Sequence, residues 1–289
     1  MTLHEAQRQL LSKLNSIYID PEAKNIADLV MENISGKKRI DRVMNKSLEL
    51  SSKDQDQLAL ITEDLMKHKP VQYVLQEAWF AGMKLYVDEN VLIPRPETEE
   101  LVEWIVSDYR NSKTTSSPRI LDIGTGSGCI ALGLKKQFGN ADVHACDISE
   151  GALRVAEKNA IAQNLSVQFH LLDILSSKDY QRLPIYDCIV SNPPYIPIAD
   201  KSSMHKNVVD YEPHLALFVS DVDPLLFYKT IEEFAESNLK QEAAIYLEIH
   251  EGLAEQVRQI FSTKGYSKID IRKDMQGKDR MLRITRNIA

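Results

Sequence analysis

A glycine-rich run between residues 120 and 128 is the first segment whose composition points to ligand binding. It reads Ile120-Leu-Asp-Ile-Gly-Thr-Gly-Ser-Gly128 and joins a predicted strand to a predicted helix. Glycines at such a junction permit a tight turn and let a ligand approach the backbone. The third glycine comes one residue earlier than in the fingerprint of dinucleotide-binding proteins. We therefore expect a cofactor loop, and we disfavour a dinucleotide, at Gly124, Thr125, Gly126, Ser127 and Gly128.

Aspartates mark the ends of three successive predicted strands. Asp122 precedes the glycine run, Asp147 ends the next strand and Asp173 follows the third. Carboxylates beside the loop oppose a pyrophosphate and favour a cation, and S-adenosylmethionine carries a sulfonium and an ammonium but no phosphate. Asp147 suits the ribose hydroxyls, and Asp173 suits the adenine amine. Each aspartate alone could equally cap a helix or a turn, but their common sheet edge favours S-adenosylmethionine.

A second motif, Asn192-Pro-Pro-Tyr195, follows the predicted strand Asp187–Ser191. Two prolines after a strand fix φ and remove two N–H donors, so nearby carbonyl groups stay available as acceptors. Asn192 adds a side-chain carbonyl, and Tyr195 adds an aromatic face. A pair of acceptors beside a ring matches a planar NH2 group, which predicts catalytic roles for Asn192, Pro193, Pro194 and Tyr195. The alternative is a stiff turn without chemistry.

The two motifs together resemble those of class I S-adenosylmethionine-dependent methyltransferases that modify planar nitrogens. Further segments are similar to the signature of the bacterial peptide chain release factor glutamine N-methyltransferases. The match runs from about residue 70 to the end, while the helices before it agree in position and length more than in sequence. The segments concerned are Pro70-Val-Gln-Tyr-Val-Leu75, Val91-Leu-Ile-Pro-Arg-Pro-Glu-Thr-Glu99, Val190-Ser-Asn-Pro-Pro-Tyr-Ile196, Glu212-Pro213 and Gly277-Lys-Asp-Arg280.

The resemblance implies transfer of a methyl group to the side-chain amide nitrogen of glutamine in the Gly-Gly-Gln loop of translation termination factors. It implies S-adenosyl-L-homocysteine as the second product, a seven-stranded sheet, and an N-terminal helical domain that helps to dock the release factor. It also places Arg95, Glu97 and Thr98 near the substrate. Where the family often has an aromatic residue after Asp173, this sequence has Ile174, which can pack against the adenine without stacking.

Three regions differ in their hydrophobic pattern. Residues 1–78 predict a helical bundle, with Asp20 as an N-cap before Pro21. Residues 79–93 predict a linking β-hairpin around Asp88-Glu-Asn90. The expected core of the bundle comprises Leu10, Leu14, Ile17, Ile26, Leu29, Val30, Leu58, Ile61 and Leu65.

From residue 94 onward, strands alternate with helices, which predicts an α/β domain with a doubly wound, mostly parallel sheet. A short link at Lys273–Asp279 favours an antiparallel last strand. Asn111–Pro118 is predicted as a polar loop and Ile196–Tyr211 as a lid. Strands are expected at 119–123, 142–147, 166–171, 187–191, 243–249, 267–272 and 280–286, and helices at 96–110, 129–137, 150–163, 224–239 and 252–264.

The charge and composition narrow the function classes. The chain has 289 residues and a formal net charge of −7, which argues against a surface that grips nucleic acid. The seven histidines lack metal-ligand spacing, and the three cysteines form no framework, so we expect no metal site and a reduced cytoplasmic compartment. Apolar runs are too short to span a membrane. We expect release factors as partners and a monomer.

Two alternative enzymes share the second motif. A DNA or RNA amino-methyltransferase would use it on a flipped base but needs a wide basic surface, and residues 1–78 carry a net charge of −1. A glutamine methyltransferase acting on a ribosomal protein is the closer alternative, and only the resemblance argues against it. An NAD-dependent oxidoreductase and a scaffold protein without activity are both disfavoured by the intact glycine run.

Overall fold

The computed structural model describes residues 1–111 and 117–285, so most of the loop predicted at Asn111–Pro118 lies outside the described residues. The chain forms two compact units. One contains Met1–Glu77 together with His205–Tyr211, and the other contains Ala78–Met204 and Glu212–Ala289. Within the described residues, no helix is long and apolar enough to cross a membrane.

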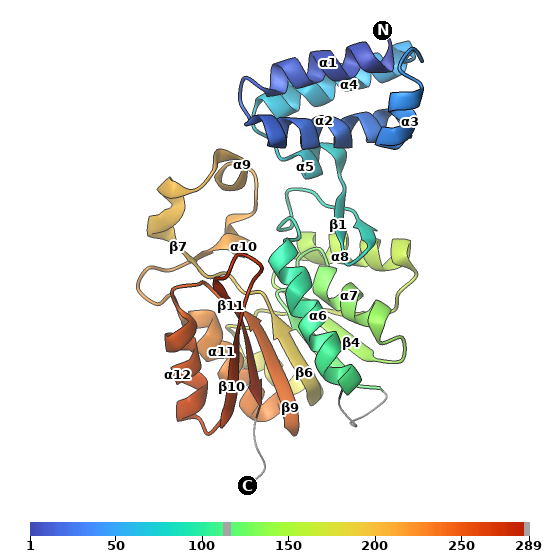
Figure 1. Ribbon diagram of the computed structural model, residues 1–289. Coiled ribbons are helices and arrows are strands. Elements are labelled where there is room, and N and C mark those ends of the chain that lie inside the picture. Colours follow the sequence, from blue (N-terminus) through green and yellow to red (C-terminus); the bar gives the residue numbers. More distant parts are fainter. Residues whose placement is uncertain (112–116, 286–289) are drawn as a thin grey trace. The chain divides into compact units, whose positions relative to one another are not determined.

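The first unit is helical, as predicted for residues 1–78 (Figure 1). Helix α1 begins at a capping box, in which Thr2 and Glu5 satisfy each other's backbone N–H groups. Ser51 caps α4 by accepting from the N–H of Asp54. The helices are α1 (Leu3–Leu14), α2 (Asp20–Ser35), α3 (Arg39–Met44), α4 (Ser52–Met66), α5 (Val71–Leu75) and α9 (Lys206–Val209).

The core of this unit follows the predicted apolar stripes in most positions. Two details differ. Leu29 is 42% exposed, and Ile17 lies beyond the end of α1. The predicted N-cap at Asp20 was wrong by one residue, because Ile19 keeps the extended conformation and Asp20 already has helical geometry. Confirmed core residues include Leu10, Leu14, Ile26, Val30, Leu58, Ile61 and Leu65.

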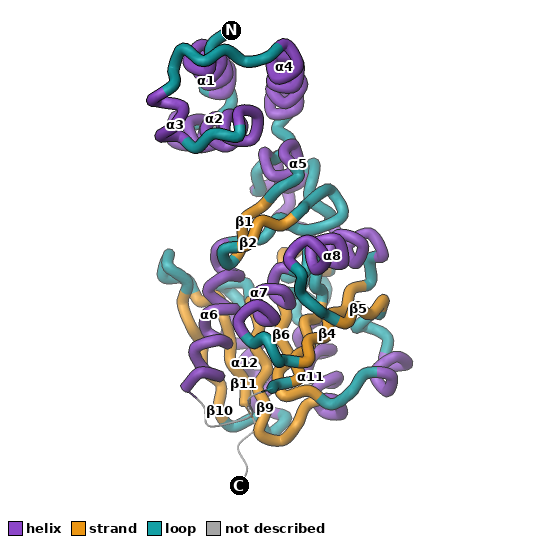
Figure 2. Tube along the Cα trace, turned by 90° about the vertical axis from the view of Figure 1, so that its right-hand side faces the viewer, coloured by secondary structure: helices purple, strands orange, loops and turns teal. Residues whose placement is uncertain are grey.

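The second unit begins with the hairpin of β1 (Ala78–Phe80) and β2 (Met83–Leu85), which lie side by side in Figure 2. The predicted position of the turn was wrong. It lies at Ala81–Gly82, whose φ angles are 47° and 67°. Two positive φ angles are typical of the two-residue turns that suit the right-handed twist of hairpin strands. The polar residues Asp88–Asn90 lie after the strands, where the Asp88 side chain accepts from the N–H of Asn90.

Across the described residues, seven strands form the large sheet in the order β10-β11-β9-β6-β3-β4-β5. Neighbouring strands from β9 to β5 run parallel, and β11 is antiparallel to both its neighbours, which confirms the predicted antiparallel last strand. The strands are β3 (Arg119–Ile123), β4 (Asp142–Asp147), β5 (Gln168–Leu171), β6 (Tyr186–Ser191), β9 (Leu239–Glu248), β10 (Lys268–Lys273) and β11 (Asp279–Thr285).

Helices cover both faces of this sheet, as in a doubly wound fold (Figure 1). Alternate strand residues enter opposite cores, so that Ile120 packs under α6 and α7 while Leu121 packs under α11 and α12. The covering helices are α6 (Pro96–Asn111), α7 (Cys129–Gln137) and α8 (Glu150–Gln163) on one face, and η1 (Ser177–Arg182), α11 (Leu226–Asn238) and α12 (Ala254–Thr263) on the other.

The segment between β6 and α11 contains short elements that the sequence did not predict. Strand β9 also begins four residues earlier than predicted, because Leu239 follows α11 directly and pairs with Tyr186. The short elements are β7 (Ile196–Pro197), η2 (Ile198–Ser203), α10 (His214–Leu217) and β8 (Phe218–Val219), with β7 and β8 paired in parallel.

Candidate active site

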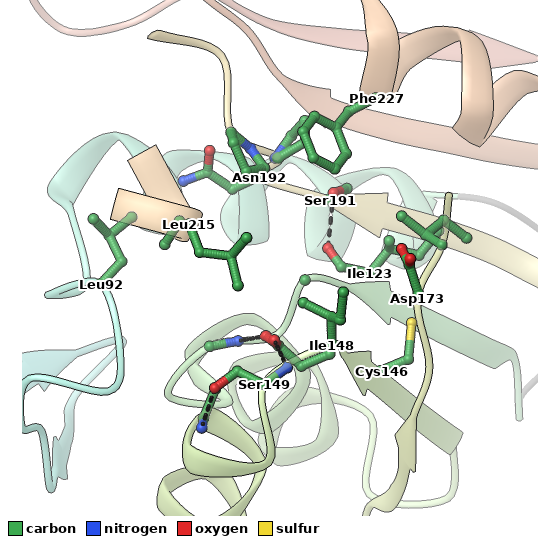
Figure 3. A pocket seen from close by; sticks show the side chains of 18 of the residues that line it. Leu92, Ile123, Cys146, Ile148, Ser149, Asp173, Ser191, Asn192, Leu215 and Phe227 are labelled. Carbon is green, nitrogen blue, oxygen red and sulfur yellow. Dashed lines mark hydrogen bonds between the residues drawn. The ribbon is translucent and has the colours of Figure 1, made fainter. Parts of the chain in front are cut away.

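A cavity in the second unit opens at the carboxyl ends of β3, β4 and β6 (Figure 3). This is the edge at which ligands bind in parallel α/β sheets. Both predicted motifs contribute to it. Its lining includes Val91, Leu92, Gly124, Gly126, Asp147, Ile148, Leu172, Asp173, Ile174, Asn192, Pro193, Pro194, Pro213, Leu215 and Phe227.

Four N–H groups of the glycine loop, those of Gly124, Thr125, Gly126 and Gly128, are already engaged within the protein. Those of Gly124 and Thr125 donate to the carbonyl of Cys146 at 2.9 and 3.0 Å. The N–H of Gly126 donates to Asp147 Oδ2 at 2.9 Å, and that of Gly128 donates to the Thr125 carbonyl at 2.8 Å. A phosphate cradle needs free N–H groups, so this loop is not built for a pyrophosphate.

Not all of the predicted loop residues face the cavity. Gly124 and Gly126 line it, whereas Thr125 and Ser127 are buried and Gly128 is the N-cap of α7. Gly128 has a φ of 80°, and a Cβ placed there would lie 3.2 Å from the Cβ of Ala156. That glycine therefore allows α7 and α8 to pack closely.

Asp122 lies beneath the loop and does not line the cavity. Its Oδ2 accepts from the Thr125 hydroxyl at 2.7 Å and from the Ala131 N–H at 3.2 Å. Gly128 has no side chain with which to cap α7, so Asp122 stabilises the first turn of that helix from the strand end. Complete burial raises the pKa of Asp122 to about 7.

Asp147, at the end of β4, and Asp173, which follows β5, both line the cavity. Asp147 accepts from Gly126 and also from the Ser149 N–H at 2.9 Å. Burial raises the pKa of Asp147, although these two N–H groups oppose the shift. Asp173 is half-buried and accepts from the Leu175 N–H, and Ile174 beside it lines the apolar part of the cavity.

The turn Asn192–Tyr195 follows β6, which pairs directly with β3. Asn192, Pro193 and Pro194 line the cavity. The Asn192 Nδ2 donates to Thr98 Oγ1 at 3.2 Å. Among the described residues, none donates to Asn192 Oδ1 or to the Pro193 carbonyl. Two acceptors therefore remain available at the cavity, as the sequence indicated.

Tyr195 differs from the other three residues of the motif because it is not part of the cavity lining. Its hydroxyl donates to Glu248 Oε1 at 3.1 Å, and its ring contacts His250 edge-on. Glu248, at the end of β9, is 1% exposed and also accepts from Thr98 Oγ1 at 2.7 Å. Burial raises the pKa of Glu248, while these two hydroxyls and the charge of Arg280 lower it.

A second buried carboxylate, Glu212, joins two segments beside the cavity. It accepts from the Ile93 N–H at 3.1 Å and from the Arg95 guanidinium. Val91 and Leu92 precede these partners, and Pro213 follows Glu212; all three line the cavity. Of the residues that the resemblance placed near the substrate, Thr98 contacts Asn192, Arg95 holds Glu212, and Glu97 contacts Gln276.

Sequence reasoning missed several functional positions. Phe227 and Ile231 come from α11, whose apolar pattern is that of any amphipathic helix, so no sequence signal marks them. Ile148 and Leu172 adjoin Asp147 and Asp173, and this adjacency could have found them. Pro213, Leu215 and Ala216 line the cavity, whereas Ile196–Met204 of the same unit do not, and the lid at Ile196–Tyr211 stays a prediction.

Comparisons with known proteins give matches over most of the chain. Residues 5–75 match the model of the PrmC N-terminal domain, and residues 105–211 match that of the methyltransferase small domain. The chain is 40% identical to the release factor glutamine methyltransferase of Flavobacterium psychrophilum over 284 residues, covering 98% of this chain and 99% of the relative. The relative of the same name from Bacteroides thetaiotaomicron is 40% identical, covering 94% and 96%.

The chain belongs to the release factor glutamine methyltransferases. A solved structure, the hMettl16 catalytic domain in complex with a MAT2A 3′UTR hairpin, has a TM-score of 0.53 with 15% identity and covers 83% of this chain and 84% of that one. This likeness shows the shared methyltransferase fold alone.

The cavity of this release factor glutamine methyltransferase suits a cationic cofactor. Among its described lining residues there is no lysine, arginine or histidine, whereas two aspartates are present. Apolar side chains, including Ile123, Ile148 and Leu215, surround the remaining space (Figure 3). This donor set fits S-adenosylmethionine better than a dinucleotide. No cluster of described histidines, cysteines or carboxylates has the arrangement of a metal site.

Proposed function

We propose that this chain transfers a methyl group from S-adenosylmethionine to the side-chain amide nitrogen of the glutamine in the Gly-Gly-Gln motif of peptide chain release factors. Membership of the family supports the substrate. The observation that carries the chemistry is the pair of acceptors, Asn192 Oδ1 and the Pro193 carbonyl, at a cavity suited to a cation. This pair can receive both N–H groups of a planar amide.

The cofactor site consists of two parts. Asp147 would accept from the ribose hydroxyls, and Asp173 and Ile174, which also line the cavity, would hold the adenine. Gly124 and Gly126, with Thr125, Ser127 and Gly128 supporting the loop, would leave room for the methionine part, and Asn192 would face the reacting end. S-adenosylmethionine, when bound, supplies a methyl group on a positively charged sulfur. S-adenosyl-L-homocysteine leaves as the second product.

Asn192 and Pro193 perform the catalytic work in this proposal. An amide nitrogen is a weak nucleophile because its lone pair is delocalised into the carbonyl. Two fixed acceptors orient that nitrogen for in-line attack. They also stabilise the positive charge that develops on it, as an oxyanion hole stabilises a negative charge. Pro194 keeps the turn rigid, and Tyr195, which lies outside the cavity lining, anchors the turn through its hydrogen bond to Glu248. The product nitrogen loses its extra proton to water.

The remaining parts of the proposal concern the setting of the enzyme. We assign the docking of the release factor to the helical unit, which matches the N-terminal family model. We also propose that the chain acts as a monomer. Three buried free cysteines support a reducing, cytoplasmic compartment. The net charge of −7 disfavours a direct nucleic-acid substrate.

Methyl transfer from labelled S-adenosylmethionine to a purified release factor tests the proposal. The controls are the same factor with the glutamine of Gly-Gly-Gln changed to alanine, a ribosomal protein fraction, and duplex DNA. We expect label on the intact factor alone. Label on DNA or on a ribosomal protein, with none on the factor, would contradict the substrate while leaving the cofactor site intact.

A further inference from the structure

Glu248 is a buried carboxylate that does not line the cavity, yet it is connected to the catalytic turn through two hydroxyls. Its Oε2 accepts from Thr98 at 2.7 Å, and its Oε1 accepts from Tyr195 at 3.1 Å. Thr98 is 2% exposed and accepts from Asn192 Nδ2 at 3.2 Å. Helix α6, the turn after β6 and the end of β9 therefore meet in one hydrogen-bonded chain.

The direction of each hydrogen bond in this chain follows from the carboxylate. An ionised carboxylate can only accept, so the single proton of the Thr98 hydroxyl is committed to Glu248. Toward Asn192 that hydroxyl can then only accept. The Asn192 amide must present its NH2 group to Thr98, and its carbonyl oxygen must point the other way.

We infer that Glu248 and Thr98 are positioning residues that select the orientation of the Asn192 amide in which its oxygen, not its nitrogen, receives the substrate. This inference rests on the proposed catalytic role of Asn192. An amide turned by 180° would present N–H donors to the N–H groups of the substrate. That arrangement is repulsive, so the orientation decides whether the turn is catalytic.

The same chain strengthens Asn192 as an acceptor. Hydrogen bonds in series polarise one another, and the negative charge of Glu248 draws the Asn192 N–H toward Thr98. The Asn192 oxygen gains negative partial charge as a result. The benefit is largest when positive charge develops on the substrate nitrogen, so the effect belongs to turnover more than to binding.

Glu248 has several partners that favour its charged form. Burial, the largest influence, raises the pKa of Glu248 and Glu97 adds to this rise, whereas the two hydroxyls and the charge of Arg280 lower it. Arg280 is itself held by Asp274 and donates to the Ile249 carbonyl. The Tyr228 hydroxyl donates to the backbone carbonyl of Glu248 at 3.3 Å, which fixes the end of β9.

The decisive pair of variants is Thr98→Val and Thr98→Ser. Valine keeps the shape but removes the hydroxyl, so kcat should fall ~10–100-fold while KM for S-adenosylmethionine stays within ~2-fold. Serine restores the hydroxyl and should return kcat to within ~3-fold of wild type. A matched control is Thr62→Val, which removes another buried hydroxyl, one that bonds only within α4 to the Leu58 carbonyl.

A second variant, Glu248→Gln, tests the orientation directly. Its NH2 group can donate to Thr98, which frees the hydroxyl proton and permits the wrong Asn192 orientation. We expect kcat to fall ~10-fold with unchanged affinity for S-adenosyl-L-homocysteine by calorimetry. Glu232→Gln, at a buried acid 3.5 Å from Lys264, is the matched control and should leave kcat unchanged.

The outcomes separate this inference from the proposed function. Wild-type protein that fails to label a release factor contradicts the proposed function. Active wild-type protein with undiminished kcat in Thr98→Val and Glu248→Gln contradicts the inference alone. Equal losses in Thr98→Val and Thr98→Ser, or losses confined to KM, also overturn it. If the circular dichroism spectrum shows that Thr98→Val does not fold, the kcat of Glu248→Gln relative to wild type tests the inference.

Discussion

The glycine loop and the Asn192–Tyr195 turn lie on neighbouring strands but are held in place in opposite ways. The loop is fixed by residues close to it in the chain, since the Gly126 N–H bonds to Asp147 21 positions later and Asp122 bonds within nine residues. The turn is fixed by Thr98, 94 positions before Asn192, and by Glu248, 53 positions after Tyr195.

In the proposed function, this difference separates cofactor binding, which we assign to the loop, from turnover, which we assign to the turn. The loop is complete once β3 and β4 have paired, so it offers a preformed surface to the cofactor. The turn can take its catalytic orientation only when α6 and β9 have also assembled around it. Changes in the loop should therefore act on cofactor affinity or stability, and changes in the turn should act on the rate of methyl transfer.

The largest expected effect breaks the turn itself. Asn192→Ala removes one of the two acceptors that stabilise the developing charge, so kcat should fall ~10²–10³-fold, as when one donor of an oxyanion hole is removed. The affinity for S-adenosyl-L-homocysteine should change by less than ~5-fold, a change measurable by calorimetry. Equal turnover in Asn192→Ala would remove the catalytic assignment.

The second effect concerns the carboxyl beneath the loop. The pKa of Asp122 rises from 3.8 to about 7 on folding. The folded state therefore favours the protonated carboxyl. The stability that this group contributes is fully present below pH 3.8 and is lost as the pH rises through about 7. Between pH 5 and pH 8 the loss should amount to about 2–3 kcal/mol of unfolding free energy.

Asp122→Asn tests this pH dependence. The asparagine oxygen can accept the two hydrogen bonds that Asp122 Oδ2 now accepts, while no charge is buried. Urea unfolding at pH 5 and pH 8 should therefore show the variant gaining stability relative to wild type as the pH rises. A constant difference between the two proteins would mean that Asp122 does not titrate in this range.

The smallest effect should come from Asp147→Asn. The amide group faces the Gly126 and Ser149 N–H groups with one acceptor in place of two, and it loses charge near the cofactor. We expect KM for S-adenosylmethionine to rise ~10-fold with kcat nearly unchanged, which initial-rate kinetics would measure. A fall in kcat instead would contradict the assignment of cofactor affinity to the loop and of the rate of methyl transfer to the turn.

The same comparison explains what the sequence could predict. The boundaries of α7, β4 and α8 agree with the predicted residue ranges, because their apolar periods and glycine punctuation are local. Asp147 and Asp173 could be placed at the cavity because each ends a strand of one parallel sheet. Asp122 also ends a strand, but its side chain turns inward to α7, and nothing in its neighbours' types distinguishes the two directions.

Interactions between distant segments could not be predicted in this way. Glu248 lies in an apolar strand and reads as an isolated acid until β9 is placed beside β6. Glu212 belongs to a short motif in the sequence, but its partners Ile93 and Arg95 lie more than a hundred residues away. The hairpin turn was misplaced because Asp88–Asn90 has turn-forming residues, whereas the real turn includes Ala81, a residue that rarely adopts a positive φ.

The composition of the helical unit limits how this protein can be divided. The unit includes His205–Tyr211, and the Tyr211 hydroxyl donates to the Lys67 carbonyl at 2.8 Å. A gene fragment that stops at Glu77 lacks part of its own fold, and one that starts at Ala78 carries a segment without its packing partners. A single crossover point therefore cannot exchange the helical unit between relatives. A chimera has to carry both Met1–Glu77 and His205–Tyr211 from the same parent.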